Sequence, residues 1–275
     1  MANMSSITAV KPTIAFFGAT GGCANACLVH TLNAGHSVAA LARTPTKLKT
    51  QLLAQGLSEE TLSRQLVIIE GNALDVAATK RTLTAGDGLV STIVSGLGGG
   101  PRLTFNLRRP LQIFSLDNPT ICESATQTLF NALQELYVEK PTLTANKPLV
   151  TFISTTGITT GPADVPFWLR FLYHQLLAIP HADKRNMETL YKKNITESDE
   201  SKRLFRNIVG VRPTLLFGSE SINDGIGLNK IRAGREQSPQ LGYSVRRADV
   251  GQWMFENIVK DGAQGWEGEM VSLTS

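Results

Sequence analysis

The chain has no long hydrophobic run, no block of basic residues and few cysteines. A helix that spans a membrane needs roughly eighteen or more apolar residues in succession, and no stretch approaches that length. The N-terminal segment, residues 1–11, is polar and lacks the basic and apolar regions of a signal peptide. We therefore expect no membrane span and no secretory signal.

The three cysteines, Cys23, Cys27 and Cys122, are odd in number and lack the spacing of metal ligands. This pattern argues against a disulfide framework and predicts no metal site. Cys23 and Cys27 lie four residues apart on one predicted helix, where small buried thiols are the ordinary outcome. A reducing compartment follows, and we expect the cytoplasm.

Basic residues exceed acidic ones only slightly, with 27 Lys and Arg against 23 Asp and Glu and a net charge of +4. This excess suits an anionic cofactor and is too small to indicate a nucleic-acid partner. The 275 residues can bury a sizeable core. We expect one domain over residues 1–275, with cap elements mainly from 155–205 and 219–245.

The most informative segment is Thr13–Ala24, where a short apolar run breaks into glycines and then opens a second apolar segment. This order predicts a buried strand, a tight turn and the N-terminus of a helix, whose unpaired N–H groups favour a phosphate. Gly18 permits the turn, Gly21 lets a pyrophosphate approach the backbone, and Ala24 is small enough for close packing on the strand. The expected phosphate-binding residues are Gly18, Thr20, Gly21, Gly22 and Cys23.

A second apolar run, residues 37–42, supplies the strand–helix–strand context that such glycines need. In an NAD site an Asp or Glu ends this second strand and holds the ribose 2′-hydroxyl. Here Arg43 and Thr44 follow the run, and Lys47 lies four residues beyond the arginine. Because a guanidinium binds a 2′-phosphate bidentately, we predict NADP(H) over NAD(H).

Further strand-like runs alternate with helical patterns along the chain, which predicts an α/β fold with a doubly wound, mainly parallel sheet. The expected strands are 66–70, 89–95, 149–154 and 207–213, and the expected helices are 45–55, 76–83, 121–136 and one from 247. Residues 59–64 are a polar segment between the expected helix 45–55 and the expected strand 66–70. Asp249, near the start of the last helix, is interpreted as a structural cap.

Two more strand ends are expected to contact the cofactor, because ligands of such sheets bind beyond the carboxyl ends of the strands. Ser95 and Gly96 open a glycine-rich loop that can approach the cofactor through its backbone. Asn72 and Asp75 follow the third strand. Asn72 is assigned to the cofactor and Asp75 to a helix cap, although an Asx turn at Asn72 is an open alternative.

In these motifs the chain resembles the atypical short-chain dehydrogenase/reductase superfamily, in its NmrA-like, NAD(P)H-binding branch. The segments that carry the resemblance span nearly the whole chain in the family's order, namely 17–24, 42–48, 71–75, 182–188, 211–213 and 247–250. The variant glycine motif, residues 21–27, looks most like the fungal averufin-oxidase-like oxidoreductases, which tailor aromatic polyketides.

The resemblance implies a catalytic Ser at the end of the fifth strand, a Tyr that moves a proton and a Lys that holds the ribose. Ser154 matches the Ser and Lys184 the Lys, but Pro180 occupies the Tyr position, and the chain has no Tyr-x-x-x-Lys. Tyr173 and His181 are the candidate replacements. Either one has a plain structural alternative as a packed or helix-terminal residue.

The sequence therefore predicts an NADP(H)-dependent oxidoreductase that transfers hydride to or from a small aromatic or quinone-like carbonyl compound, in polyketide secondary metabolism. The apolar segment 167–177 suits a flat hydrophobic substrate, or else a homodimer face or plain core. Two alternatives remain because the Tyr is missing. One is a non-redox isomerase or dehydratase on the same scaffold, and the other is an NmrA-like regulator that senses the dinucleotide without catalysis.

Overall fold

The computed structural model describes residues 13–85, 88–98, 101–103, 114–116, 118–167 and 178–275. Its centre is an eight-stranded sheet in the order β10-β12-β8-β7-β4-β1-β2-β3, in which every pairing is parallel except that of β10 with β12. The doubly wound, mainly parallel sheet is thus confirmed. The strands are β1 Ile14–Phe17, β2 Val38–Ala42, β3 Leu66–Glu70, β4 Thr92–Ser95, β7 Leu149–Ile153, β8 Asn207–Pro213, β10 Arg232–Gly234 and β12 Met270–Thr274.

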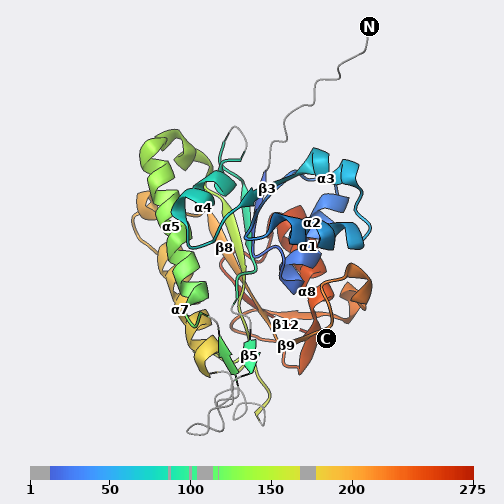
Figure 1. The fold of residues 1–275 in the computed structure, drawn as a ribbon. Helices are drawn as coiled ribbons and strands as arrows, with labels where there is room; N and C mark the ends of the chain where they lie inside the picture. The colour runs from blue at the N-terminus through green and yellow to red at the C-terminus, as the bar shows by residue number, and fades with distance from the viewer. Residues whose placement is uncertain (1–12, 86–87, 99–100, 104–113, 117, 168–177) are drawn as a thin grey trace.

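Helices cover both faces of the sheet (Figure 1). One face carries α1 Gly22–Asn33, α2 Pro45–Ala54, α3 Glu59–Gln65 and α8 Arg247–Met254. The other carries α4 Val76–Leu83, α5 Ile121–Glu139 and α7 Ala178–Ile195. Two small strand pairs, β5 Pro101–Leu103 with β6 Phe114–Leu116 and β9 Leu215–Phe217 with β11 Ser244–Arg246, lie outside the main sheet.

The core is two apolar layers, one on each face of the sheet, because successive side chains of a strand point to opposite faces. In β1, Ile14 and Phe16 join the layer under α1 and α8. Ala15 and Phe17 join the layer under α5 and α7. The four buried residues of this strand are therefore all apolar, as the sequence pattern predicts for a strand covered on both sides.

Three local features differ from the sequence expectations. The polar segment 59–64, to which no helix was assigned from the sequence, forms α3, whose first turn is fixed by Ser58 Oγ accepting the Thr61 N–H at 3.0 Å. Asp249 is buried, but α8 has no side-chain cap. Its Oδ1 instead accepts the N–H groups of Ile226 and Gly227 at 2.9 and 3.0 Å, so the residue anchors a loop. The strand β12 was not expected, and it lies inside the sheet.

Within the part of the chain that the structure describes, no helix combines the length and apolar character needed to cross a bilayer. The division into one domain with cap elements from 155–205 and 219–245 remains a prediction.

Helices α1 and α8 pack closely at Gly251, where a Cβ would lie 2.5 Å from Ala26 Cβ and 2.6 Å from the Cys23 carbonyl oxygen. We expect Gly251→Ala to lower the free energy of unfolding by about 1–3 kcal/mol, because both helices must shift. Urea denaturation measures this change. Gly161→Ala is the control, since its Cβ would meet only ordinary contacts; equal effects in the two variants would contradict the packing argument.

Candidate functional site

The turn after β1 and the loop after β4 touch through their backbones. Gly18 has φ +71°, and a Cβ on it would lie 2.8 Å from the Gly96 carbonyl carbon. Gly21 donates its N–H to the Gly18 carbonyl at 2.9 Å, and Gly96 donates its N–H to Phe17 at 2.8 Å. A Cβ on Gly96 would lie 2.4 Å from Ala24 Cβ, so helix α1 seats on the end of β4 through two small residues.

The N-terminus of α1 points out of this turn without a cap. Gly21, the N-cap residue, is extended, no side-chain cap bond is made to the helix, and its first turn holds no acidic residue. Its first backbone N–H groups and the positive end of its dipole are therefore available to an anion. This is the local structure that the glycine spacing predicts.

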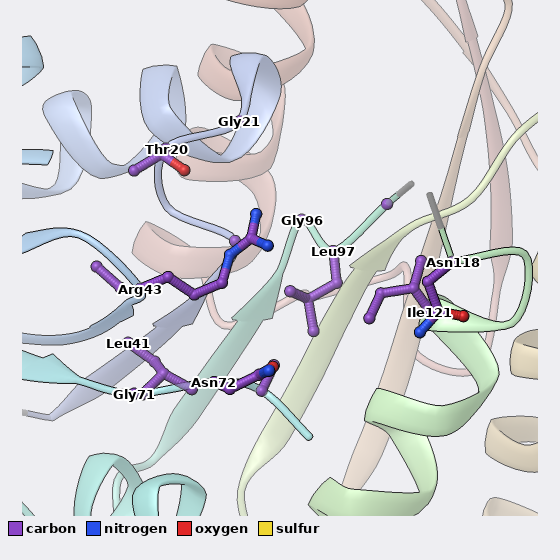
Figure 2. A pocket seen from close by; sticks show the side chains of 14 residues that line it. Thr20, Gly21, Leu41, Arg43, Gly71, Asn72, Gly96, Leu97, Asn118 and Ile121 are labelled. Carbon is purple, nitrogen blue, oxygen red and sulfur yellow. The ribbon is translucent and has the colours of Figure 1, made fainter. Parts of the chain in front are cut away.

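A cavity of about 220 Å³ opens beside this turn (Figure 2). It lies where the strand order reverses between β1 and β4, which is the usual ligand position in such sheets. Its lining comes from the loops after β1, β2, β3 and β4 and from the start of α5. The lining residues are Gly18, Thr20, Gly21, Leu41, Ala42, Arg43, Gly71, Asn72, Ala73, Gly96, Leu97, Gly98, Asn118 and Ile121.

Half of the predicted cofactor residues line this cavity, namely Gly18, Thr20, Gly21, Arg43, Asn72 and Gly96. The other half are not among the lining residues, namely Gly22, Cys23, Thr44, Lys47, Ser95 and Lys184. The sequence motifs did not point to Asn118 and Ile121, which enter from the distant start of α5. No local pattern marks them, because only the packing of α5 on the sheet brings them to the opening.

Arg43 is exposed at the end of β2 and extends toward the space beside Gly96 (Figure 2). No carboxylate occupies the end of this strand. Thr44 follows as the N-cap of α2 without a side-chain cap bond, and Lys47 is exposed on the first turn of that helix. The edge of the cavity at β2 is therefore cationic, as predicted.

Asn72 and Asp75 fix the loop after β3. Asn72 lines the cavity, while its Oδ1 accepts the Leu74 N–H at 3.1 Å in an Asx turn. An Asx turn at Asn72 and a cofactor contact by Asn72 are thus compatible, because the turn holds this residue at the opening of the cavity. Asp75 accepts the Ala77 N–H at 2.9 Å, which confirms it as the cap of α4.

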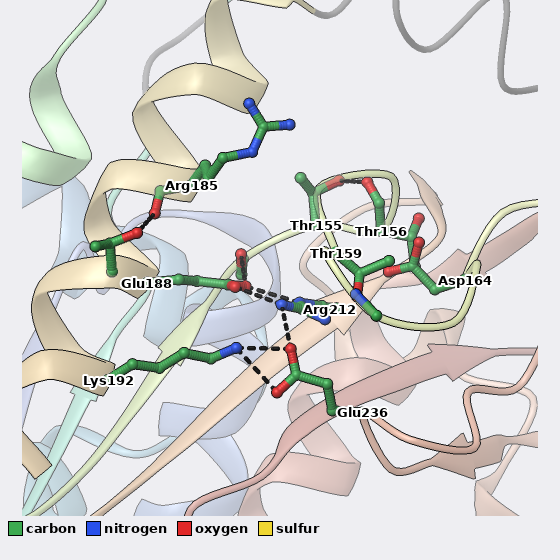
Figure 3. Close-up of polar contacts among 12 residues, drawn as sticks. Thr155, Thr156, Thr159, Asp164, Arg185, Glu188, Lys192, Arg212 and Glu236 are labelled. Carbon is green, nitrogen blue, oxygen red and sulfur yellow. Dashed lines mark hydrogen bonds and ion pairs between the residues drawn. The ribbon is translucent and has the colours of Figure 1, made fainter. Parts of the chain in front are cut away.

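Ser154 belongs to a buried polar network between α7 and β8 (Figure 3). Its Oγ donates to Glu188 Oε1 at 2.6 Å. Arg212 binds Glu188 with both Nε and Nη2, at 2.8 and 2.5 Å, and its Nη2 reaches Glu236 at 3.1 Å. Lys192 completes the network with bonds of 2.6 and 2.9 Å to Glu236. The hydroxyl predicted to orient the substrate is therefore held by a carboxylate.

Lys184 joins two strand ends. Its Nζ donates to the carbonyl oxygens of Leu97 and Ile153 at 2.9 and 2.6 Å. The ammonium group thus lies between the loop after β4 and the end of β7, with one further proton to donate. Its role as the ribose-binding Lys stays a prediction.

The remaining candidates lie on or before α7. His181 is buried near the start of this helix, and Tyr173 lies outside the described residues. Asp183, which the sequence did not single out for a role, accepts the N–H groups of Cys122 and Glu123 at 2.9 Å each. One helix therefore caps another here, and the first turn of α5 is held beside the cavity.

Asp164 is a buried carboxyl group on the loop after β7 (Figure 3). Its Oδ1 accepts the Gly157 N–H at 2.9 Å, whereas its Oδ2 has no partner among the described residues. Burial raises the pKa of Asp164, and the charge of Arg212 opposes this only in part. The ionised form is thus costly in the folded protein.

The fold and the phosphate turn are those of a Rossmann-type α/β protein. The structure resembles a short-chain dehydrogenase/reductase of Veillonella parvula in complex with NADP, with a TM-score of 0.62, 14% identity, and coverage of 96% of this chain and 94% of that one. It also resembles an anaerobillin reductase of Escherichia coli O157:H7, with a TM-score of 0.60, 19% identity and coverage of 94% and 95%. No family model matches the chain.

Two curated proteins are much more similar in sequence. The chain is 43% identical to the oxidase pynE of Aspergillus niger, with 96% of this chain and 99% of that protein aligned. It is 41% identical to the reductase pytE of Aspergillus terreus, with 96% and 98% aligned. The chain belongs to the family of these two fungal proteins, and it has the fold of the short-chain dehydrogenases/reductases. Its assignment to an NmrA-like branch stays a prediction.

We expect Glu188→Ala to lower the free energy of unfolding by about 3 kcal/mol, because it leaves the buried Arg212 guanidinium with only the longer bond to Glu236. Urea denaturation at neutral pH measures the loss. Glu60→Ala removes an exposed ion pair to Arg64 and should change stability little. If the two variants lost equal stability, the network would not hold the fold.

We expect Asp164→Asn to stabilise the protein at neutral pH, with the gain appearing as the pH rises above about 4. The sign follows from the raised pKa of Asp164: above the usual Asp pKa the unfolded chain releases this proton more readily than the folded one. Asp199→Asn is the opposite control, because the Ser201 hydrogen bonds lower the pKa of Asp199. The Asp199→Asn variant should become less stable than the wild type as the pH rises above about 4. A pH-independent difference for Asp164→Asn would refute the argument.

Proposed function

We propose that this protein is an NADP(H)-dependent oxidoreductase that transfers hydride between the cofactor and a small aromatic or quinone-like carbonyl compound. Its relatives, at 43% and 41% identity, are named an oxidase and a reductase. One structural neighbour was crystallised in complex with NADP. The aromatic substrate and a role in polyketide biosynthesis extend beyond these names and rest on the sequence resemblance.

The single observation that carries the proposal is the uncapped N-terminus of α1 in the same cavity as Arg43. The pyrophosphate of a dinucleotide fits the N-terminus of α1, because backbone N–H groups and the helix dipole favour an anion. A 2′-phosphate fits Arg43, because a guanidinium binds it bidentately. Gly18 and Gly21 both line this cavity. The residues present therefore fit NADP(H) better than NAD(H).

Bound NADP(H) would supply the hydride chemistry, and the protein would bind and orient it. Lys184 is proposed to form a hydrogen bond to the nicotinamide ribose with its third N–H. Its other two N–H groups bind carbonyl oxygens, which hold Nζ in place. Ser154 is proposed to orient the substrate by accepting a hydrogen bond from a substrate hydroxyl, because its own proton is donated to Glu188. His181 and Tyr173 stay the candidates for proton transfer in place of the missing Tyr.

The test begins with titration of the wild-type protein with NADPH and NADH, followed by intrinsic or cofactor fluorescence. The cofactor that binds is then mixed with a panel of quinones, anthraquinones and aromatic ketones, and NADPH absorbance is followed. Tight NADPH binding with oxidation by one of these compounds supports the proposal. Binding without any turnover would favour the isomerase or the dinucleotide-sensing regulator. Failure to bind either cofactor would refute the proposed function.

We expect Arg43→Ala to raise the Kd for NADPH by about tenfold or more and to change the Kd for NADH little, because only NADPH carries the 2′-phosphate. Fluorescence titration of both cofactors gives the ratio. Arg64→Ala, which removes an exposed cation on α3, is the matched control. An unchanged NADPH to NADH ratio in Arg43→Ala would contradict the assignment.

A further inference from the structure

The side chain of Arg247 lies directly against Gly22, the first residue of α1. A Cβ on Gly22 would meet Arg247 Cδ at 2.2 Å and both Cγ and Nε at 3.1 Å. The φ of Gly22 is not in the positive region, so the backbone conformation itself does not require glycine. The missing side chain instead leaves the space that the arginine occupies.

The guanidinium of Arg247 is only partly used within the protein. Its Nη1 donates to the Gly218 carbonyl at 2.7 Å. No ion pair joins it to any carboxylate of the described residues. A guanidinium carries five N–H donors, so most of its hydrogen-bonding capacity remains for a ligand.

The positive charge of Arg247 acts on the first turn of α1. Burial raises the pKa of the Cys23 thiol to about 12, and the charge of Arg247 is the largest influence that opposes this rise. A cation and the positive end of a helix dipole repel one another, which makes this placement unfavourable without an anion between them. The contact thus has the character of an anion-binding arrangement.

Arg246, the residue before Arg247, makes its contacts within the C-terminal part of the chain. Its Nη1 donates to the Asp224 carbonyl at 3.0 Å, and its guanidinium lies 5.1 Å from the centre of the Phe217 ring. Arg246 is thus used to hold the loop after β9. Arg247, one residue later at the start of α8, turns toward α1 and is positioned there by the tight packing of Gly251.

We propose that Arg247 binds the pyrophosphate of the dinucleotide, so that the C-terminal part of the chain supplies a cation to the N-terminus of α1. This inference rests on the proposed function. A guanidinium forms strong, charge-assisted bonds to phosphate oxygens, and here it would add to the backbone N–H groups of the same turn. Because NADPH and NADH share the pyrophosphate, Arg247 would serve both, whereas Arg43 would distinguish them.

The test uses Arg247→Gln, which keeps the aliphatic stem on Gly22 and removes the charge. We expect the Kd values for NADPH and NADH to rise by about tenfold each, with their ratio unchanged. The dependence of Kd on salt should become less steep, since one phosphate contact is lost. Arg247→Lys should recover part of the affinity, and the urea denaturation of the cofactor-free Arg247→Gln protein should stay close to that of the wild type.

A second variant separates binding from packing. Gly22→Ala should weaken the binding of both cofactors in the wild-type background, because the new methyl group displaces the Arg247 side chain. In the Arg247→Ala background, where the stem is absent, the same change should add little. A full additive loss in the double variant would contradict the proposed contact.

The outcomes are distinct. Wild-type affinity for both cofactors in Arg247→Gln would overturn the inference and leave Arg247 a packing residue. Weaker binding of NADPH alone in Arg247→Gln would assign Arg247 to the 2′-phosphate and overturn the pyrophosphate assignment. Failure of the wild-type protein to bind either cofactor would refute the proposed function itself, and it would be seen before any variant is measured.

Discussion

The backbone contact between Gly18 and Gly96 is the constraint on which the rest of the site depends. The two loops leave neighbouring parallel strands, β1 and β4, at the point where the strand order reverses. A side chain on either glycine would clash, at 2.8 Å in one case and 2.4 Å in the other. Their close approach sets α1 directly on the end of β4, which leaves the first N–H groups of the helix facing the cavity. Packing of the main chain therefore fixes the helix N-terminus at which the pyrophosphate is proposed to bind.

The second constraint is the buried charge network from Ser154 to Lys192. A buried carboxylate is costly unless it is paired, and Glu188 has the bidentate Arg212 as well as the Ser154 hydroxyl. The proton of Ser154 is committed to Glu188, so the oxygen can only accept a further hydrogen bond. In this protein the Ser position is thus suited to accept from a substrate hydroxyl or a protonated group.

The sequence predicts those features that arise from neighbouring residues. Buried strands with apolar residues on both faces, the glycine turn and Arg43 at the end of β2 are local patterns, and the structure has them where expected. Contacts made by distant segments leave no such pattern. Asp183 caps α5 from another helix, and Asn118 reaches the cavity only because α5 packs on the sheet. For α3, the Ser58 cap and two glutamates in the first turn were sufficient to form a helix that a polar composition alone conceals.

Gly22 shows how a local pattern and a distant contact combine. Within its own segment this residue looks like one more glycine of a phosphate turn, and nothing nearby explains why a side chain is absent. The explanation lies with Arg247, more than two hundred residues further along the chain, whose stem fills the space. Helix α8 holds that arginine in place by packing its own glycine, Gly251, on α1. The C-terminal part of the chain therefore packs on the N-terminal turn. If Arg247 binds the pyrophosphate as proposed, the glycine motif supplies only one part of the anion site.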